Sequence, residues 1–373
     1  MTTHVVCLDG TNQVKTQIDP TNVARIFDAL GGGAGEAGNG SWETTNEAVD
    51  LKGKYLPGVG AQGNPVLKIL GNAFGDGIAE PIVRGYTFLS RNYRPGDQIV
   101  VTGFSRGATA ARALAGLVVT HGLLNPDPGK YDVNNKNQAY MRAVAAWYAS
   151  RSDRRDLANQ ARLALIGLTL GQAVPPLDLP DDYVQTPQLL AVGVFDTVSS
   201  LGVPHLDAHG DAVFDFTICN TTLNPKILNG FHAIAADETR DLFAPTYWAD
   251  RPGVVQQIFP GVHSNVGGGY PERGLSDGAL KWMLDQLIGV GVPADANRLD
   301  PAPNPSAIDI ARDDAITPPF NATPCRPRNF PHTATAHQSI KDRWDKITEV
   351  FPSMRPTPYK ATGTYTDGTP IYP

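Results

Sequence analysis

Short apolar runs separated by polar turns predict the strands of this chain. The run "LLAVGVF" at residues 189–195 is rich in β-branched residues and does not alternate with polar ones. Such a run is typical of a strand that is buried on both faces of a parallel sheet. We predict further strands at residues 4–8, 99–101 and 254–259, which read "HVVCL", "IVV" and "VVQQIF".

Apolar residues that recur three and four positions apart predict helices between these strands. We expect helices near residues 22–30, 79–92, 138–171, 276–289 and 340–350, and another directly after residue 105. Strands that alternate with helices indicate an α/β fold, with a mostly parallel sheet covered by helices on both faces.

The chain is expected to form one domain over residues 1–373. Residues at about 125–185 are interpreted as a helical insertion that caps a pocket, although ordinary packing of a helical layer explains the same pattern. Fourteen of the 31 prolines lie from residue 293 onward. We therefore expect the segment at about 293–373 to wrap over the surface mostly as loop. The glycine run at residues 31–40 is expected to be a flexible loop, because no predicted strand leads into it.

The composition is that of a globular protein and argues against several partners. Hydrophobic residues make up 41% of the chain, and the net charge is −6 with both signs mixed along it. Binding to nucleic acid or to a membrane through a basic surface is therefore not expected. No apolar run approaches the roughly 18–20 residues that span a bilayer, so no transmembrane segment is expected.

Cysteine usage and the first residues bear on location. The three cysteines are widely spaced and form no CxxC pair, which favours a reducing compartment, the cytoplasm of the producing cell. The start "MTTHVVCLDG" lacks the pattern of a cleaved signal peptide, so we expect any secretion to use another route. Neither a cofactor nor a metal is expected.

The stretch "GDQIVVTGFSRGATAARALAG" at residues 96–116 carries the main chemical signal. Gly-x-Ser-x-Gly between a buried strand and a helix is the pattern of a nucleophile elbow. The turn lifts the Ser105 hydroxyl above the sheet, and the returning helix leaves no room for side chains at Gly103 and Gly107. We predict that Ser105 is a catalytic nucleophile. The alternative is a glycine turn with a purely structural role.

A serine nucleophile needs a base, normally histidine, and an acid that orients the base. In folds that carry a nucleophile elbow, the acid and then the histidine follow the serine along the chain, each at the carboxyl edge of the sheet. Asp196 ends one predicted strand, and His263 follows another, so we predict them as acid and base. The reserve candidates for base and acid are His337, Asp277 and Asp207. Other histidines are expected to be structural, with His232 on a helix.

An acyl-transfer reaction also needs donors for the oxyanion. One is expected to be the amide of Arg106, directly after the nucleophile. The loop after the first strand reads "DGTN", and we predict that the amide of Gly10 or Thr11 supplies the second donor. Asp9 is expected to hold this loop, through an ion pair with Arg106.

The same loop permits a rival interpretation. "VVCLDGT" is similar to the first motif of haloacid-dehalogenase-type phosphatases, in which a strand ends in Asp-x-Asp-Gly-Thr. The first aspartate of that motif is the nucleophile and a metal ligand, and here its position is taken by Cys7. The phosphatase interpretation therefore lacks its attacking group.

The order of several blocks resembles the DUF2235 family, an α/β-hydrolase domain that includes type VI secretion lipase effectors of the Tle1 class. The blocks are "CLDGTNQ", "YLPGVG", "GFSRGATAARALAG", "VGVFDTVSSLG", "HAIAADETRDLF", "FPGVHSNVGGGY" and "LSDGALKWM". The resemblance implies a hydrolase of acyl esters, in some members a phospholipase A, with Ser105 at the position of the family nucleophile. It also implies a lipid substrate, and a secretion carrier or an immunity protein as partner.

Two positions depart from the family pattern. Asn265 replaces the aspartate of a usual His-Ser-Asp-Val-Gly-Gly-Gly-Tyr block, and "HQS" at residues 337–339 replaces a usual His-Asp-Ser. An altered site is consistent with a second hypothesis, a non-catalytic module that uses the hydrolase fold to bind a lipid, glycan or protein.

Overall fold

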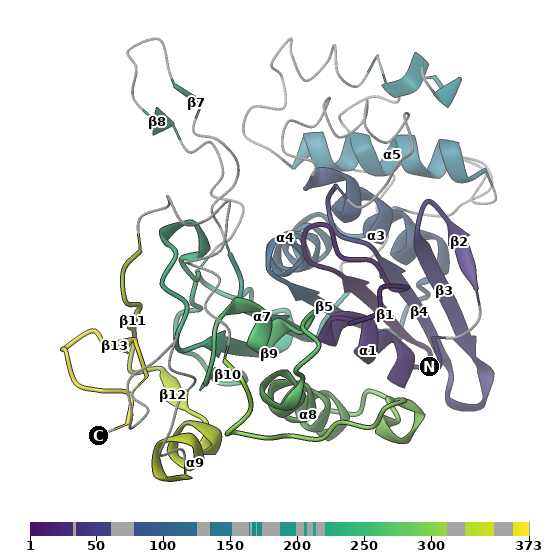
Figure 1. Ribbon diagram of the computed structural model, residues 1–373. Helices are drawn as coiled ribbons and strands as arrows, with labels where there is room; N and C mark the ends of the chain where they lie inside the picture. Colours follow the sequence, from purple (N-terminus) through teal and green to yellow (C-terminus); the bar gives the residue numbers. More distant parts are fainter. Residues whose placement is uncertain are drawn as a thin grey trace.

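A computed structural model of the chain contains a nine-stranded sheet with helices on both sides (Figure 1). The structure describes residues 1–32, 35–60, 78–124, 135–150, 187–198, 221–311, 325–346 and 361–372, and short pieces at 164, 166–168, 170–173, 205–206 and 212–213.

The strand order of the sheet is β12-β10-β9-β6-β5-β1-β4-β3-β2. The strands from β12 to β4 are parallel, and β3 and β2 run antiparallel at one edge. This confirms the predicted mostly parallel α/β sheet. In chain order the strands are β1 (Thr3–Leu8), β2 (Glu36–Gly38), β3 (Ser41–Asn46), β4 (Leu51–Leu56), β5 (Gln98–Phe104), β6 (Leu189–Phe195), β9 (Ile227–Ala235), β10 (Val254–Phe259) and β12 (Ala334–Ala336).

Helices cover the two faces in separate layers (Figure 1). One layer holds α3 (Ala79–Asn92), α4 (Arg106–His121) and α5 (Lys136–Ala149), and the other holds α1 (Asn22–Ala29) and α8 (Gly274–Gly289). The remaining helices are the short α7 (His263–Gly267) and α9 (Gln338–Lys346), which packs at the β12 edge. None of the helices in the described part of the chain is long and apolar enough to cross a bilayer.

The central strands carry runs of consecutive apolar residues because each strand supplies both cores. In β1, Val6 and Leu8 belong to the core with α3 and α4, whereas Val5 and Cys7 belong to the core with α1 and α8. All four side chains are at most 1% exposed. The non-alternating pattern follows directly from this two-sided burial.

Two sequence expectations are wrong in the strand regions. His232 lies on the buried strand β9 and not on a helix. The glycine run at residues 31–40 is not simply a loop, because β2 begins at Glu36 and pairs with β3. In both cases strand pairing overrides a weak local signal.

The proline-rich end and the predicted insertion are described in part. Within residues 293–373, β12 joins the sheet, and β11 (Asn329–Phe330) pairs with β13 (Thr364–Tyr365). Of the predicted insertion at 125–185, α5 packs on α3, and most of the rest lies outside the described residues. The capping role of the insertion stays a prediction.

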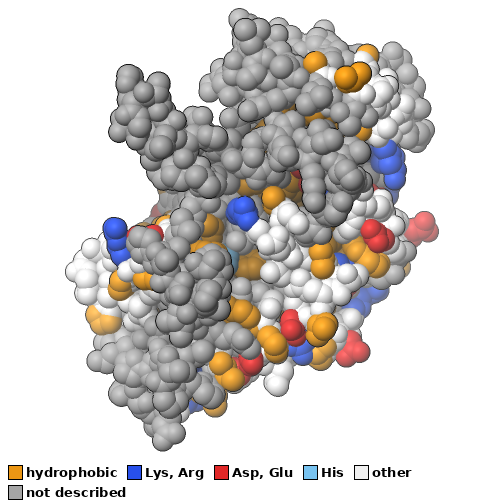
Figure 2. Space-filling model, turned by 45° about the horizontal axis from the view of Figure 1, so that its top comes forward, with side chains coloured by type: hydrophobic (Ala, Val, Ile, Leu, Met, Phe, Trp, Pro, Cys, Tyr) orange, Lys and Arg blue, Asp and Glu red, His pale blue; other side chains and the backbone are white. Residues whose placement is uncertain are grey.

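The surface carries both signs of charge. On the face shown in Figure 2, acidic and basic side chains are scattered, and hydrophobic side chains gather around a hollow near the middle. The mixture matches the interspersed charges of the sequence.

Candidate active site

Ser105 lies in a strained turn between β5 and α4. Its backbone has φ 58° and ψ −125°, a conformation that a residue with a side chain rarely adopts. Such strain costs on the order of 1–3 kcal/mol and persists only where the surroundings enforce it. The Ser105 amide donates to the carbonyl of Phe195 at 3.1 Å, which fixes the turn to the end of β6.

The two flanking glycines are required by close backbone contacts. A Cβ at Gly103 would overlap the carbonyl of Gly107, and a Cβ at Gly107 would overlap the carbonyls of Leu8 and Asp9. The sequence therefore holds α4 tightly against the ends of β5 and β1, as expected for a nucleophile elbow.

Asp196 and His263 meet beside this turn. Asp196 follows β6, His263 begins α7 after β10, and the His263 Nδ1 to Asp196 Oδ2 distance is 2.6 Å. Both side chains are buried. The imidazole ring contacts the ring of Phe104, the residue before Ser105, with 4.6 Å between centroids, and the ring of Phe243 at 4.8 Å. The predicted acid and base are thus brought together next to the elbow.

The second imidazole nitrogen has no hydrogen-bond partner in the part of the chain that the structure describes. His263 Nε2 is buried and makes no hydrogen bond. Buried polar atoms are normally paired, so an unpaired one needs an explanation. In a hydrolase this is the nitrogen that accepts the serine proton during catalysis.

Arg328 is a component of the site that the sequence analysis missed. Its guanidinium donates to both carboxylate oxygens of Asp196, at 2.7 and 2.9 Å, and to the Ala235 carbonyl at 2.8 Å. Burial by itself raises the pKa of Asp196, but the Arg328 charge and the His263 hydrogen bond hold it well below its usual range. Asp196 is therefore a carboxylate anion.

Glu238 is a second residue that the analysis did not single out. Its carboxylate pairs with Arg240 at 2.6 Å and accepts a hydrogen bond from the backbone amide of His263 at 3.3 Å. Burial raises the pKa of Glu238, and the Arg240 hydrogen bonds more than offset this. Glu238 thus holds the backbone at the start of α7, and the block "ADETRDLF" that contains it was the only sequence signal.

The loop after β1 differs from expectation in how Asp9 is held. Its carboxylate accepts hydrogen bonds from Thr21 Oγ1 at 2.7 Å, Tyr55 Oη at 2.6 Å and the Gly10 amide at 2.7 Å. The expected ion pair between Asp9 and Arg106 is wrong, because Arg106 Nε contacts the hydroxyl of Thr11 instead. Asp9 faces the core, where its partners are hydroxyls.

The hydrogen bond from Gly10 also narrows the choice of oxyanion donor. The Gly10 amide already donates to Asp9. Thr11 remains as the donor that this loop can offer, and the Thr11 hydroxyl binds the side chain of Arg106, the residue after the elbow serine.

The reserve candidates have other partners. Asp277 on α8 forms a buried ion pair with Arg25 on α1. His337 stacks on Phe259 with 4.4 Å between centroids and bonds to Ser339 Oγ at 2.8 Å. Asp207 lies outside the described residues. The structure does not bring Asp277 or His337 to the Asp196–His263 pair.

Asn265 has a structural role that accounts for its side chain. Its Oδ1 accepts from the Val262 amide at 3.2 Å, and its Nδ2 donates to the Ile310 carbonyl at 3.3 Å. The second bond requires an amide, since a carboxylate cannot donate. Asn265 therefore fixes the start of α7 without touching Asp196.

The phosphatase interpretation fits poorly. Cys7 stands where the nucleophilic aspartate would be, is fully buried, and burial raises the pKa of its thiol to about 12. Both oxygens of Asp9 are occupied by hydrogen bonds inside the protein.

Comparison with known proteins gives one family over most of the chain. A family model described as "T6SS, Phospholipase effector Tle1-like, catalytic domain" matches residues 2–286. The uncharacterized protein YEL023C of Saccharomyces cerevisiae is 29% identical over 134 residues, which are 32% of this chain and 18% of that protein.

Two solved structures are similar to this chain at lower sequence identity. An uncharacterized protein from Pseudomonas aeruginosa is 17% identical with a TM-score of 0.38, over 79% of this chain and 46% of that one. A Tle1 effector bound to the VgrG spike of the type 6 secretion system is 18% identical with a TM-score of 0.38, over 73% of this chain and 52% of that one. The chain spans less than two thirds of the length of each of these three relatives. By the family match, the chain belongs to the Tle1-like catalytic domain family of type VI secretion phospholipase effectors.

Proposed function

We propose that the protein hydrolyses the acyl esters of lipids, with phospholipids as the favoured class, through Ser105, His263 and Asp196. Family membership supports the lipid ester as substrate. The observation that carries the proposal is the state of His263: Nδ1 is bonded to a buried carboxylate, Nε2 has no hydrogen-bond partner among the described residues, and the ring contacts Phe104, the residue before the strained Ser105.

The proposed reaction proceeds through an acyl-enzyme. Ser105 Oγ forms a bond to the ester carbonyl carbon while its proton passes to His263 Nε2. The carbonyl π electrons move onto oxygen, where the amides of Arg106 and Thr11 stabilise the negative charge. Collapse of this intermediate breaks the bond to the alcohol oxygen, which takes the proton from His263. Water then repeats the sequence on the acyl-enzyme and releases the carboxylic acid.

The role of Asp196 in this scheme is to orient the base. Its carboxylate accepts a hydrogen bond from Nδ1–H, so that the neutral imidazole keeps its proton on Nδ1 and presents the lone pair of Nε2 to the serine. It also stabilises the imidazolium that forms when Nε2 takes a proton. The low pKa of Asp196 supports this role, because only the anion provides that stabilisation.

Family membership also supports delivery by a type VI apparatus. Under this proposal the protein is exported through that apparatus, with a secretion carrier as partner.

The decisive experiment compares Ser105→Ala with Ser339→Ala. Ser339 is a matched control because it too is bonded to a histidine, His337. The wild type and Ser339→Ala should react covalently with a fluorophosphonate and release fatty acid from phospholipid vesicles. Ser105→Ala should lose the label and at least about 10⁴-fold in kcat while keeping its fold. Full turnover in Ser105→Ala refutes the mechanism. A wild type that neither reacts nor hydrolyses favours a non-catalytic binding module.

A further inference from the structure

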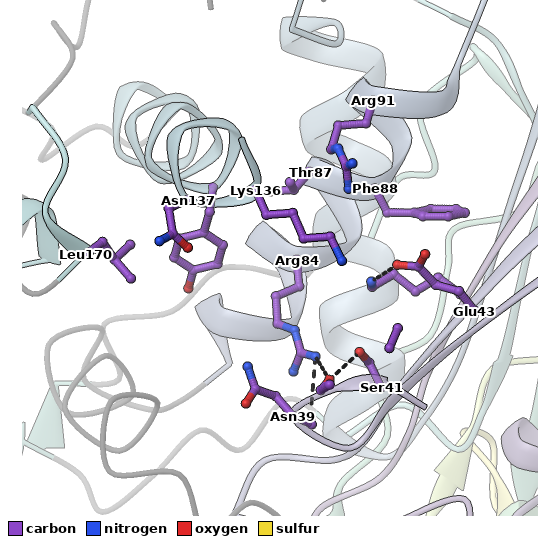
Figure 3. A pocket seen from close by; sticks show the side chains of 14 residues that line it. Asn39, Ser41, Glu43, Arg84, Thr87, Phe88, Arg91, Lys136, Asn137 and Leu170 are labelled. Carbon is purple, nitrogen blue, oxygen red and sulfur yellow. Dashed lines mark hydrogen bonds and ion pairs between the residues drawn. The ribbon is translucent and has the colours of Figure 1, made fainter. Parts of the chain in front are cut away.

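A second cavity lies on the other half of the sheet, away from the candidate active site. It is lined by the β2–β3 hairpin, β4, α3 and the start of α5, and its volume is about 230 Å³ (Figure 3). None of its lining residues belongs to the site around Ser105. A space of this size holds a small polar group.

The cavity has a strong excess of positive charge. Among the described residues that line it, one carboxylate, Glu43, stands against four cations, which are Lys54, Arg84, Arg91 and Lys136. In Figure 3 the side chains of Arg91 on α3 and Lys136 on α5 extend toward the space in front of Glu43. Arg84 points toward the β2–β3 hairpin, where its guanidinium donates to the Gly38 and Asn39 carbonyls at 3.4 and 3.5 Å. This concentration is notable in a chain whose net charge is −6.

Two carboxylates of the described residues pair with these cations, so four positive charges face two negative ones and positive charge remains in excess. Glu43 pairs with Lys54 at 2.5 Å, and Arg84 pairs with Glu80 on its own helix at 2.9 Å. No other described residue forms a hydrogen bond or ion pair with the Lys136 side chain. Burial lowers the pKa of Lys54, Glu43 partly restores it, and the neighbouring Arg84 and Lys136 lower it further. The cations therefore repel one another across the cavity, and an anion placed there would relieve the repulsion.

A neutral hydrogen-bond donor at the cavity also lacks an acceptor. Tyr140 lines the cavity, and its hydroxyl is buried and has no hydrogen-bond partner among the described residues. A buried hydroxyl without a partner is uncommon, and an oxyanion would accept its proton. Lys136 and Asn137 form the first turn of α5, which Asn135 caps, so the positive end of the helix dipole adds to the same field.

We propose that this cavity binds a phosphate group or a similar oxyanion, either as a free ion or within a phospholipid headgroup. Arg and Lys at several angles satisfy the separate oxygens of a phosphate, and Tyr140 supplies a further donor. The inference does not depend on catalysis at Ser105.

Titration with inorganic phosphate tests the shared chemistry. Calorimetry on the full chain should show saturable binding, and the melting temperature should rise with phosphate but not with chloride at equal ionic strength. Lys136→Ala should weaken binding about ten-fold, since a charge-assisted contact is lost. Lys281→Ala removes the same charge from an exposed position on α8 and should change nothing. Equal affinities in these two variants, or no effect specific to phosphate, overturn the proposal.

Tyr140→Phe separates a ligand-binding role from a structural one. It removes one hydroxyl without changing charge, so we expect phosphate binding to weaken several-fold with the same dependence on salt. If the hydroxyl has no ligand, the variant should bind phosphate like the wild type and be no less stable, because an unsatisfied polar group has been removed.

A vesicle arm distinguishes the two sources of phosphate. In a Ser105→Ala background, which spares the lipid, co-sedimentation is compared on vesicles of phosphatidylcholine with and without phosphatidic acid. Binding that requires phosphatidic acid and is weakened by Lys136→Ala identifies the headgroup as ligand. Phosphate binding without such vesicle binding identifies the free ion.

Discussion

The ion pair between Arg328 and Asp196 determines how the candidate base is held. Asp196 is fully buried, and its two oxygens are shared among Arg328, His263 and the Ala235 amide. The guanidinium keeps the carboxylate ionised and fixes its plane. It also places a positive charge near an imidazole that must become a cation, so Arg328 is a positioning residue whose benefit lies in geometry.

Replacing Arg328 should lower the stability of the protein and its activity at acidic pH. In Arg328→Met, Asp196 is a buried charge without its cation, and the free energy of unfolding should fall by about 3–5 kcal/mol. The pKa of Asp196 should rise, because burial then acts with less opposition. A depressed carboxyl pKa stabilises the fold above its usual value of 3.8 and ceases to do so as pH falls. The variant should therefore lose stability and kcat/KM at higher pH than the wild type.

Urea unfolding measures the change in stability, and pH–rate profiles measure the change in kcat/KM. Arg328→Lys keeps the charge and should restore part of both effects. Arg326→Met is the matched control, since this neighbouring side chain is 79% exposed and should tolerate the change. If the acid limb of the pH–rate profile is not shifted in Arg328→Met, the ion pair contributes to the stability of the fold and not to activity.

The sequence indicated the residues of the site that lie next to strong local patterns, and it missed the others. Ser105 lies in a recognisable turn, and Asp196 and His263 follow buried strands. Arg328 comes from "TPCRPRNF", where nothing local signals burial. Its role arises only when β12 and the chain before it fold against the sheet edge, and such long-range contacts leave no periodic trace.

At the scale of elements, the elbow depends on how closely α4 approaches the strands. Gly107→Ala should separate α4 from the end of β1, because the new Cβ would overlap two carbonyl oxygens. We expect a loss of about 1–3 kcal/mol in unfolding free energy and a larger loss of kcat, since Ser105 and the Arg106 amide move with the helix.

A second glycine in the same helix provides the control. Gly116 has open space around its Cβ position, so Gly116→Ala should stabilise the protein by about 0.5–1 kcal/mol with unchanged activity. Thermal unfolding and ester hydrolysis measured on both variants decide the matter. Equal behaviour of the two alanines would contradict the requirement for close packing at Gly107.

The sequence predicted the strands that are buried on both faces and the helices that bury one apolar stripe. The strands β1, β5, β6 and β10 were predicted because each contains consecutive apolar residues. By contrast, β4 reads "LKGKYL" and buries alternate positions, and β3 carries mostly polar residues near the sheet edge. The conformation of β4 depends on pairing with β1, and that of β3 depends on pairing with β4, so their own sequences predict them weakly.

At the scale of the whole molecule, two buried groups oppose each other in their response to pH. Asp9 at the end of β1 has its pKa raised by burial to about 6, although three hydrogen bonds oppose the shift. His232 on β9 has its pKa lowered to about 3 by burial and by the charge of Arg112. Its Nε2 accepts from the Thr197 amide at 3.2 Å, which requires the neutral ring.

The signs of the two contributions follow from linkage. Below pH 6 the folded state binds a proton at Asp9 that the unfolded state binds only near 3.8, so acidification stabilises the fold. Below 6.5 the unfolded state binds a proton at His232 that the folded state refuses, so acidification destabilises it. Each contributes about 1.4 kcal/mol per pH unit, and between about pH 6 and pH 4 they largely cancel.

Substitution of either group should reveal the pH dependence of stability that the other group contributes. On acidification from about pH 6 to pH 4.5, Asp9→Asn should lose about 2 kcal/mol of unfolding free energy relative to the wild type, and His232→Gln should gain about 2 kcal/mol. Urea unfolding of the wild type, both single variants and the double variant at four pH values measures this directly. The change with pH is compared, and not the absolute stability, so a constant cost of either substitution drops out. Asp196 does not interfere, because its contribution is lost only below the usual carboxyl range. Parallel pH dependences in all four proteins would mean that neither group titrates with a shifted pKa.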